Sequence, residues 1–259
     1  MLFVLSPAKT LDFDSPTPAG LKPSKPAFVA QSAQLVDTLR ERSAADLAQL
    51  FGVSDAIATL NQQRFAQWST RFGASNARPA VLAFNGDVYE GLDAKRLSPS
   101  QLQWANQHVA ILSGLYGVLA PLDWMQPYRL EMGTALANAR GRNLYQFWGD
   151  AIAKHLNQWQ ASEAKPVLVN LASQEYFKAV DRKVLRARVV QCVFEDLKGG
   201  KYKVISFLAK RARGLMVRYA VTKQVTTVRG LQGFNLEGYR FEASVSDEQT
   251  LVFRRDAKP

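Results

Sequence analysis

One run of 26 residues without a charged side chain, positions 97–122, constrains the fold of this chain more than any other feature. About 20 apolar residues are enough to cross a bilayer, so the run raises the question of a membrane span. It also contains polar residues and prolines that a lipid-facing helix does not tolerate, namely Gln101, Gln103, Asn106, Gln107, His108, Ser113, Pro99 and Pro121. The run therefore predicts buried core, and we expect no membrane partner.

Few residues of this chain can ligate a soft metal or form a disulfide. It has one cysteine, Cys192, and two histidines, His108 and His155. These numbers exclude an intramolecular disulfide, zinc ribbons, iron–sulfur clusters and haem attachment. We expect no metal and no cofactor, and we expect Cys192, within the apolar segment 189–194, to be an inert buried thiol. The apolar segment 2–5 is too short for a signal peptide, which predicts a cytoplasmic protein.

Positive charge is concentrated in one part of the chain. Residues 178–240 hold 15 Lys and Arg against 4 Asp and Glu, whereas residues 1–177 hold 15 against 14 and residues 241–259 hold 3 against 4. The whole net charge of +11 thus resides in a segment of 63 residues, which we call the basic segment. Such concentration favours a polyanionic partner over general solubility.

Hydrophobic periodicity and turn residues predict alternating helices and strands without a repeat. We expect strands at 2–5, 80–84, 167–171, 189–194 and 202–207, and a closing hairpin of 239–245 with 250–254. We expect helices at 28–42, from Ser43, from Ser54 towards Trp68, from Ser98, at 145–159 and at 208–222. Ser43 with Asp46 forms a short capping box, and Ser98-Pro99 is a helix start. Since no linker divides these elements, we predict a single α+β domain, residues 1–259, with a mixed sheet.

The first candidate site lies between the second and third predicted helices, at about 44–68. Its sequence LAQLFGVSDAIA, residues 47–58, matches the helix–hairpin–helix form L-x-x-L-x-G-hydrophobic-G-x-x-x-A except at Ser54, which replaces the second glycine. In that motif a tight turn at Gly52 and Val53 directs free backbone N–H groups of the next helix towards a phosphate. The alternative is an ordinary connection in which Gly52 ends one helix and Ser54 caps the next.

The second candidate site is the basic helix at 208–222. At about 100° per residue, Lys210, Arg211, Arg213 and Arg218 share one face, opposite an apolar stripe. Gly214 lies within the basic face, where a missing side chain would let a phosphate approach closely. The alternative is a solvated helix face without a partner.

The third candidate site is the polar stretch 123–131, which adjoins the charge-free run. Asp123, Tyr128, Arg129 and Glu131 are candidates for partial burial, and an ion pair of Arg129 with Glu131 or Asp123 is one reading. The other is an active-site cleft in which a carboxylate acts as acid or base on DNA or nucleobases. No Walker, G-x-G-x-x-G, G-x-S-x-G or H-E-x-x-H motif occurs, so no catalytic residue is assigned.

Several sequence blocks resemble the bacterial YaaA family, also called UPF0246. They occur in order along nearly the whole chain, at 5–11, 84–92, 112–119, 125–133, 144–150, 170–178, 205–216 and 233–239. The resemblance implies a DNA-binding protein of the peroxide-stress response, linked to lower free intracellular iron. It also implies a single α+β domain with a helix–hairpin–helix element and a positively charged cleft.

Charge and resemblance together predict a largely sequence-independent DNA-binding protein. The expected partner is duplex DNA, including distorted or partly single-stranded DNA. The residues expected to contact phosphates are Gly52, Val53, Ser54, Lys178, Arg182, Lys183, Lys210, Arg211, Arg213, Gly214 and Arg218. An enzyme that uses the 123–131 stretch, and a scaffold whose basic face binds an acidic protein, are the alternatives.

Overall fold

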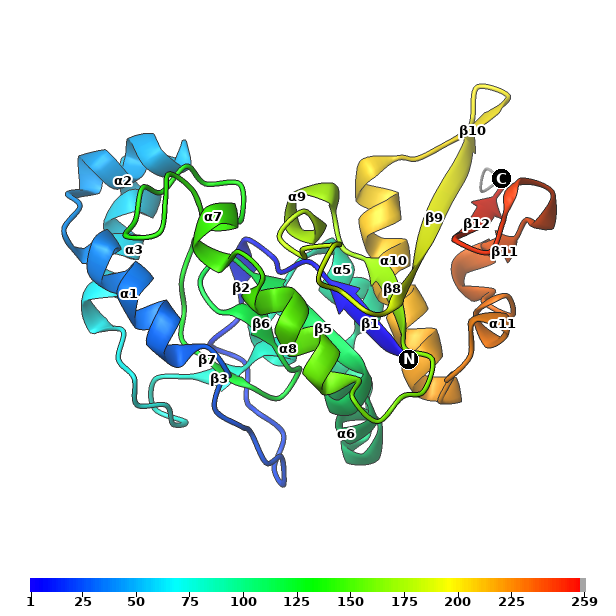
Figure 1. Ribbon diagram of the computed structural model, residues 1–259, viewed down its shortest axis with the longest axis horizontal. Coiled ribbons are helices and arrows are strands. Elements are labelled where there is room, and N and C mark those ends of the chain that lie inside the picture. The colour runs from blue at the N-terminus through cyan, green and yellow to red at the C-terminus, as the bar shows by residue number, and fades with distance from the viewer. Residues whose placement is uncertain (257–259) are drawn as a thin grey trace.

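A mixed eight-stranded sheet forms the centre of the computed structural model, which describes residues 1–256 (Figure 1). The strand order is β11-β12-β9-β8-β1-β5-β6, and β10 pairs with β9. The five strands from β12 to β5 run parallel, whereas β6, β10 and β11 pair antiparallel with their neighbours. This architecture confirms the predicted α+β class with a mixed sheet.

The sheet strands are β1 (Leu2–Leu5), β5 (Val109–Ser113), β6 (Gly117–Leu119), β8 (Val167–Leu171), β9 (Arg188–Lys198), β10 (Lys201–Lys203), β11 (Arg240–Phe241) and β12 (Thr250–Arg255). Two further pairs are β2 (Thr10–Leu11) with β4 (Phe84–Asn85), and β3 (Arg78–Pro79) with β7 (Trp124–Met125). The α-helices are α1 (Val29–Arg40), α2 (Ala44–Phe51), α3 (Asp55–Gln67), α4 (Ala80–Ala83), α5 (Asp87–Leu92), α6 (Pro99–His108), α7 (Leu144–Trp148), α8 (Ala151–Trp159), α9 (Gln174–Phe177), α10 (Ser206–Lys223) and α11 (Val228–Leu231). Short 3-10 turns lie at Ala94–Arg96, Leu236–Gly238 and Ala243–Val245.

The charge-free run contributes to the core, as predicted. It supplies α6 and the adjacent strands β5 and β6, in which every residue is buried. Ser98 begins α6 with a capping box, because its Oγ accepts from Gln101 N (3.2 Å) and Gln101 Oε1 accepts from Ser98 N (2.9 Å). β1 is also buried along its length, as expected of a strand that is covered on both faces.

Four predicted elements differ from the structure. The strand predicted at 239–245 is limited to Arg240–Phe241, because Ala243–Val245 form a 3-10 turn. Residues 80–83 form helix α4 instead of a strand, since a short apolar run has no periodicity that separates the two. The helix predicted at 145–159 is broken at Gly149, whose φ of 49° ends α7 before α8 begins. The strand predicted at 202–207 ends at Lys203, because Ser206 and Phe207 already belong to α10.

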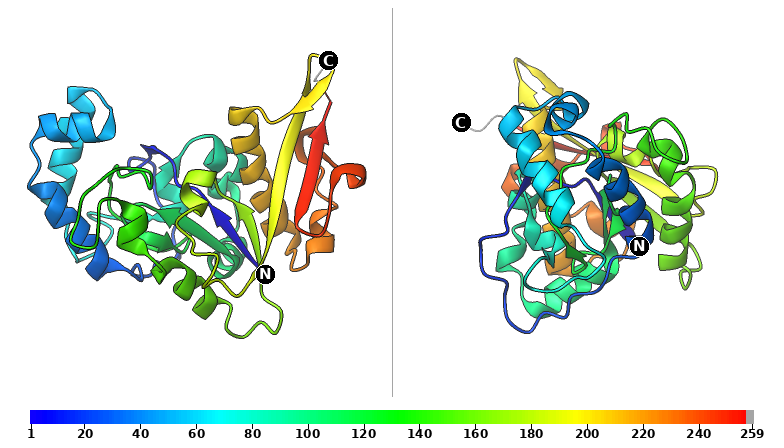
Figure 2. Two further views of the ribbon diagram at one scale, coloured as in Figure 1. Left: turned by 45° about the horizontal axis from the view of Figure 1, so that its top comes forward. Right: turned by 90° about the vertical axis from the view of Figure 1, so that its left-hand side faces the viewer.

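Two parts of the chain project from opposite ends of the sheet (Figures 1 and 2). Helices α1, α2 and α3 lie together at one end, and α2 carries the capping box of Ser43 and Asp46 that the sequence predicted. The long strand β9 and its partner β10 form a hairpin that extends beyond the body at the other end. The short helix α9 lies between them, near the upper end of α10 in Figure 1.

Candidate functional site

The carboxyl ends of β1 and β8 meet at a topological switch point of the sheet. After β1, the next strand of the main sheet along the chain is β5, which lies on the side of β1 away from β8. After β8, the next strand is β9, which lies on the side of β8 away from β1. Ligand sites in open parallel sheets lie in the crevice outside such strand ends. The loop after β1 and the loop after β8 are linked by a hydrogen bond, in which Ser173 N donates to Ser6 Oγ (2.9 Å).

Two cavities open at this edge. The larger has a volume of about 980 Å³ and lies beside the carboxyl end of β8, between the 172–183 segment, β9 and α10. The smaller, of about 480 Å³, lies over the loop after β1, the turn before α5 and the start of α9. Arg213 of α10 lines both cavities, so they adjoin at its side chain.

The structure brings five of the predicted cations together around these cavities. Lys178, Arg182, Lys183 and Arg213 line the larger cavity, and Lys210 joins Arg213 at the smaller. The cations come from the turn and loop that follow α9, and from α10. Among residues 1–256, none of the five makes an ion pair with a carboxylate. We call these five residues the cation cluster.

Aromatic rings hold two members of the cation cluster in place. The Lys178 ammonium lies 4.9 Å from the centroid of the Tyr145 ring, and the Arg182 guanidinium lies 5.8 Å from that of Phe177. Cation–π contacts of this kind orient a charge without neutralising it. The positive charge therefore stays available at the rim of the cavity.

Arg213 is the most deeply placed member of the cation cluster. Its Nε is buried and has no hydrogen-bond partner within the described part of the chain, and burial lowers the pKa of its guanidinium. A buried donor without an acceptor costs about 1–3 kcal/mol, more when the group is charged. Arg213 is thus an energetically unsatisfied cation that an anion at the cavity would stabilise.

Three other predicted residues of α10 lie outside the cation cluster. Arg211 forms an ion pair with Glu237 (2.6 Å), and Arg218 donates to the carbonyl oxygens of Leu92 (3.1 Å) and Asp93 (3.0 Å). Gly214 is buried against α5, where a Cβ would overlap the carbonyl oxygen of Val88. The prediction that Gly214 opens a path for a phosphate is therefore wrong, because the neighbour of this glycine is protein backbone.

The predicted hairpin Gly52–Ser54 lies in the helical group at the other end of the molecule (Figure 1). Gly52 ends α2 in the left-handed conformation at φ 60°, and Ser54 precedes α3 without a side-chain capping bond. Val53 packs partly against the core. Asp55 occupies the first turn of α3, where it already places negative charge at the helix N-terminus.

The 123–131 stretch does not form one acidic cleft. Asp123 is buried in a turn, where Ser24 Oγ (2.6 Å) and Ala120 N (2.8 Å) donate to its carboxylate. Arg129 pairs with Glu131 (3.0 Å), which confirms the predicted structural ion pair. Glu131 lines the smaller cavity and also binds Lys9 (2.7 Å). Asp123 and Glu131 therefore belong to separate environments, and the 123–131 stretch does not bring its carboxylates together in one cleft.

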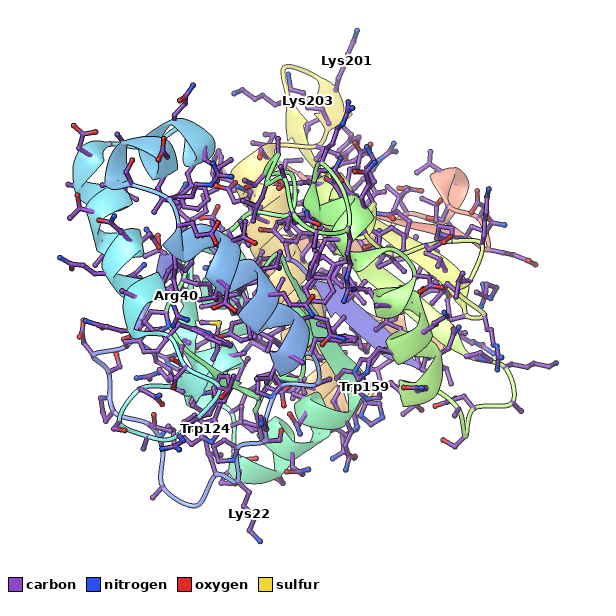
Figure 3. The ribbon with its side chains drawn as sticks, turned by 60° about the vertical axis from the view of Figure 1, so that its left-hand side comes forward. Lys22, Arg40, Trp124, Trp159, Lys201 and Lys203 are labelled. Atoms are coloured by element: carbon purple, nitrogen blue, oxygen red, sulfur yellow. The ribbon has the colours of Figure 1, made fainter. Side chains whose placement is uncertain are left out.

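Sequence reasoning missed an apolar edge next to the cations. Val204 and Phe207 are 53% and 62% exposed, just before and within the first turn of α10, and Val204 lines the larger cavity. Lys201 and Lys203 extend from the adjoining hairpin (Figure 3). In the sequence, lysines alternate with large apolar residues in 201–207. We interpreted this pattern only as a strand, although it also marks an exposed surface that is both basic and apolar.

The described part of the chain holds neither a long apolar helix nor a metal-ligand cluster. No helix within residues 1–256 is long and apolar enough to cross a membrane. Over the same residues, no three His, Cys, Asp or Glu side chains are grouped so that they could hold a metal ion.

The sequence of the chain matches a known protein family. The model of the family described as peroxide stress protein YaaA matches residues 1–245. The chain is 64% identical over 255 residues to a UPF0246 protein of Paracidovorax citrulli, with 98% of each chain covered. It is 61% identical over 257 residues to a UPF0246 protein of Bordetella petrii, covering 99% of this chain and 100% of the relative.

Proposed function

The chain belongs to the YaaA family of peroxide stress proteins, and we propose that it acts by binding DNA largely without regard to sequence. The observation that carries this proposal is the cation cluster. Five basic side chains, which form no ion pair with a carboxylate of residues 1–256, converge on two adjoining cavities at the carboxyl ends of β1 and β8. Contacts of Lys and Arg with phosphates fix the position of a duplex and carry no base information.

The surface around the cation cluster extends the same chemistry. Lys198, Lys201 and Lys203 are exposed on the β9–β10 hairpin, which adjoins the start of α10. In Figure 3, Lys201 and Lys203 lie at the end of the molecule opposite Lys22. Eight cations of the basic segment thus lie at or next to the two cavities, and their field attracts a polyanion over a distance of about one Debye length.

The residues that the sequence predicted as phosphate contacts do not all support this proposal equally. Arg211 and Arg218 are held by Glu237 and by the carbonyl oxygens of Leu92 and Asp93, so their role is to anchor α10. Gly52, Val53 and Ser54 are retained as a second, distant contact with the DNA backbone. The five residues of the cation cluster are the primary contacts that we propose.

The test is the salt dependence of binding to random-sequence duplex DNA, measured by fluorescence anisotropy. The logarithm of the binding constant should fall against the logarithm of salt concentration with a slope of about −0.9 per neutralised phosphate, and we expect about 4–7 such contacts. The double variant Lys210→Gln, Arg213→Gln should weaken binding to all duplexes alike. The slope should become less negative by the amount that corresponds to about two phosphate contacts.

The matched control removes two charges from the loop that carries Lys22. Lys22→Gln with Lys25→Gln makes the same change in net charge, and both side chains are exposed. The control should bind like the wild type to within about twofold, since exposed charges beyond a Debye length are screened. A slope near zero, or equal losses in the two double variants, would contradict the proposal.

A further inference from the structure

The larger cavity exists because β8 is shorter than β9. β8 ends at Leu171, and its pairing with β9 stops at Asn170 and Gln191. On the same edge, β10 begins to pair only at Asp196. Residues 192–195 of β9 therefore have no strand beside them on that edge, and the cavity of about 980 Å³ occupies this gap.

The walls of the cavity combine apolar surface with two amide side chains. Val193, Phe194 and Val204 contribute to the lining, together with Phe177. At the end of β8, Asn170 Nδ2 donates to Gln191 Oε1 (2.8 Å). The Gln191 amide nitrogen has no acceptor among the described residues and can still donate. The cavity thus presents apolar surface and a polar group that can recognise a hydrogen-bonding edge.

Positive charge lies at the border of the cavity. Arg213 lines it and has a buried Nε without a partner, and Lys178, Arg182 and Lys183 line the opposite wall. Few ligand classes need apolar faces, an amide contact and a neighbouring cation together. A nucleotide does, because its base has two π-faces and a hydrogen-bonding edge, and its phosphate carries charge.

We propose that this cavity receives one unpaired nucleotide of the bound DNA, with its base against the β9 edge and its phosphate at Arg213. The volume lies within the range of about 300–1,000 Å³ that small-ligand pockets occupy. This inference rests on the proposed DNA binding. It adds that the protein prefers DNA in which a base has already left the stack, because unstacking a paired base costs a few kcal/mol.

The experiment compares a paired duplex with the same duplex carrying a single bulged 2-aminopurine. The wild type should bind the bulged duplex at least about fivefold more tightly, and the fluorescence of 2-aminopurine should change on binding as the base enters the cavity. Val204→Trp places a large ring at the cavity. It should reduce the preference to within about twofold while leaving affinity for the paired duplex within about twofold of the wild type.

Val245→Trp is the matched control. Val245 is 45% exposed, close to the 53% of Val204, and lines neither of the two cavities at the strand ends. This variant should keep the full preference and the fluorescence change. Arg213→Gln should weaken binding of both duplexes and should also reduce the preference, because the phosphate of the bulged nucleotide loses its partner.

The outcomes separate the two proposals. Absence of binding to any duplex contradicts the proposed function itself. Equal binding of paired and bulged duplexes, or a preference that survives Val204→Trp, overturns the nucleotide site and leaves duplex binding intact. Tight binding of free dAMP that Val204→Trp abolishes, without any preference for the bulge, also overturns it, because the cavity would then serve a free nucleotide.

Discussion

Gly91 of α5 and Gly214 of α10 let the two helices cross with their backbones in contact. A Cβ on Gly91 would overlap the carbonyl oxygen of Arg211, and a Cβ on Gly214 would overlap that of Val88. Each glycine thus accommodates the backbone of the other helix. On α10 the contact lies at residues 211–215, directly after Lys210 and around Arg213. The crossing therefore positions two members of the cation cluster.

Gly214→Ala should therefore lower stability. The added methyl group meets backbone, which cannot rotate away, and overpacking of this kind costs about 1–3 kcal/mol or more. Thermal unfolding followed by circular dichroism measures the loss. Gly73→Ala is the control, because nothing lies within 4 Å of its Cβ position, and it should be neutral or slightly stabilising. Equal melting temperatures of the two variants would contradict the close crossing.

Gly214 also shows where sequence reasoning about the site failed. The helical wheel correctly predicted a basic helix, which the structure has as α10, and it placed Gly214 on the basic face. It could not predict that α5 covers the later turns of that face, because the contact joins residues more than 120 positions apart. In the early turns of α10 that face stays open, with Phe207 and Lys210 exposed.

Local signals were more reliable than long-range ones. The capping box at Ser43, the helix start at Ser98-Pro99, the helix end at Gly52 and the buried strand 2–5 follow from short stretches of sequence, and the structure confirms them. The cation cluster joins the loop after α9 to α10 across the gap beside β8. The distribution of charge along the sequence predicted the basic segment. Which of its cations lie around the same cavity depends on the order of the strands in the sheet.

Cys192 should be unreactive in the folded protein. The thiol is buried in β9, and burial raises its pKa to about 12, so almost no thiolate exists at neutral pH. At pH 8, a disulfide reagent such as DTNB should modify the native protein far more slowly than the protein in denaturant. Rapid modification of one thiol per native chain, or its conversion to sulfenic acid by peroxide, would instead make Cys192 a redox sensor.

His155 should make the protein less stable in mild acid. Its ring packs between Phe28 (5.2 Å) and Trp159 (5.8 Å), and burial lowers its pKa below the usual 6.5. As the pH falls through about 6.5, the unfolded chain takes up a proton before the folded chain does, so stability decreases. His155→Phe should reduce the fall in melting temperature between pH 7 and pH 5.5. A His155 proton resonance that titrates at or above pH 6.5 would contradict this account.

The purified protein should hold no stoichiometric iron, although the family resemblance implies a link to free iron. Nitrogen–oxygen iron sites commonly use two histidines and a carboxylate on one face. In this chain His108 stacks on Trp104, and His155 belongs to a different helix, α8. Within residues 1–256, no three His, Cys, Asp or Glu side chains are grouped so that they could hold a metal ion. Elemental analysis of untagged protein purified without chelator is the measurement. Iron near one equivalent per chain after gel filtration would overturn the prediction.

Asp55 tests whether the Gly52–Ser54 hairpin contacts DNA. Its carboxylate lies in the first turn of α3, where a phosphate would bind the free N–H groups, so it repels the anion that the hairpin would attract. Asp55→Asn should raise affinity for duplex DNA about two- to threefold at low salt, and should lower helix stability by about 0.3–1 kcal/mol. Glu248→Gln makes the same change in charge at an exposed position before β12 and should have a smaller effect on affinity. If the two variants bind DNA equally, the duplex does not reach α3. The cation cluster and the lysines of the β9–β10 hairpin would then make the whole of the DNA contact.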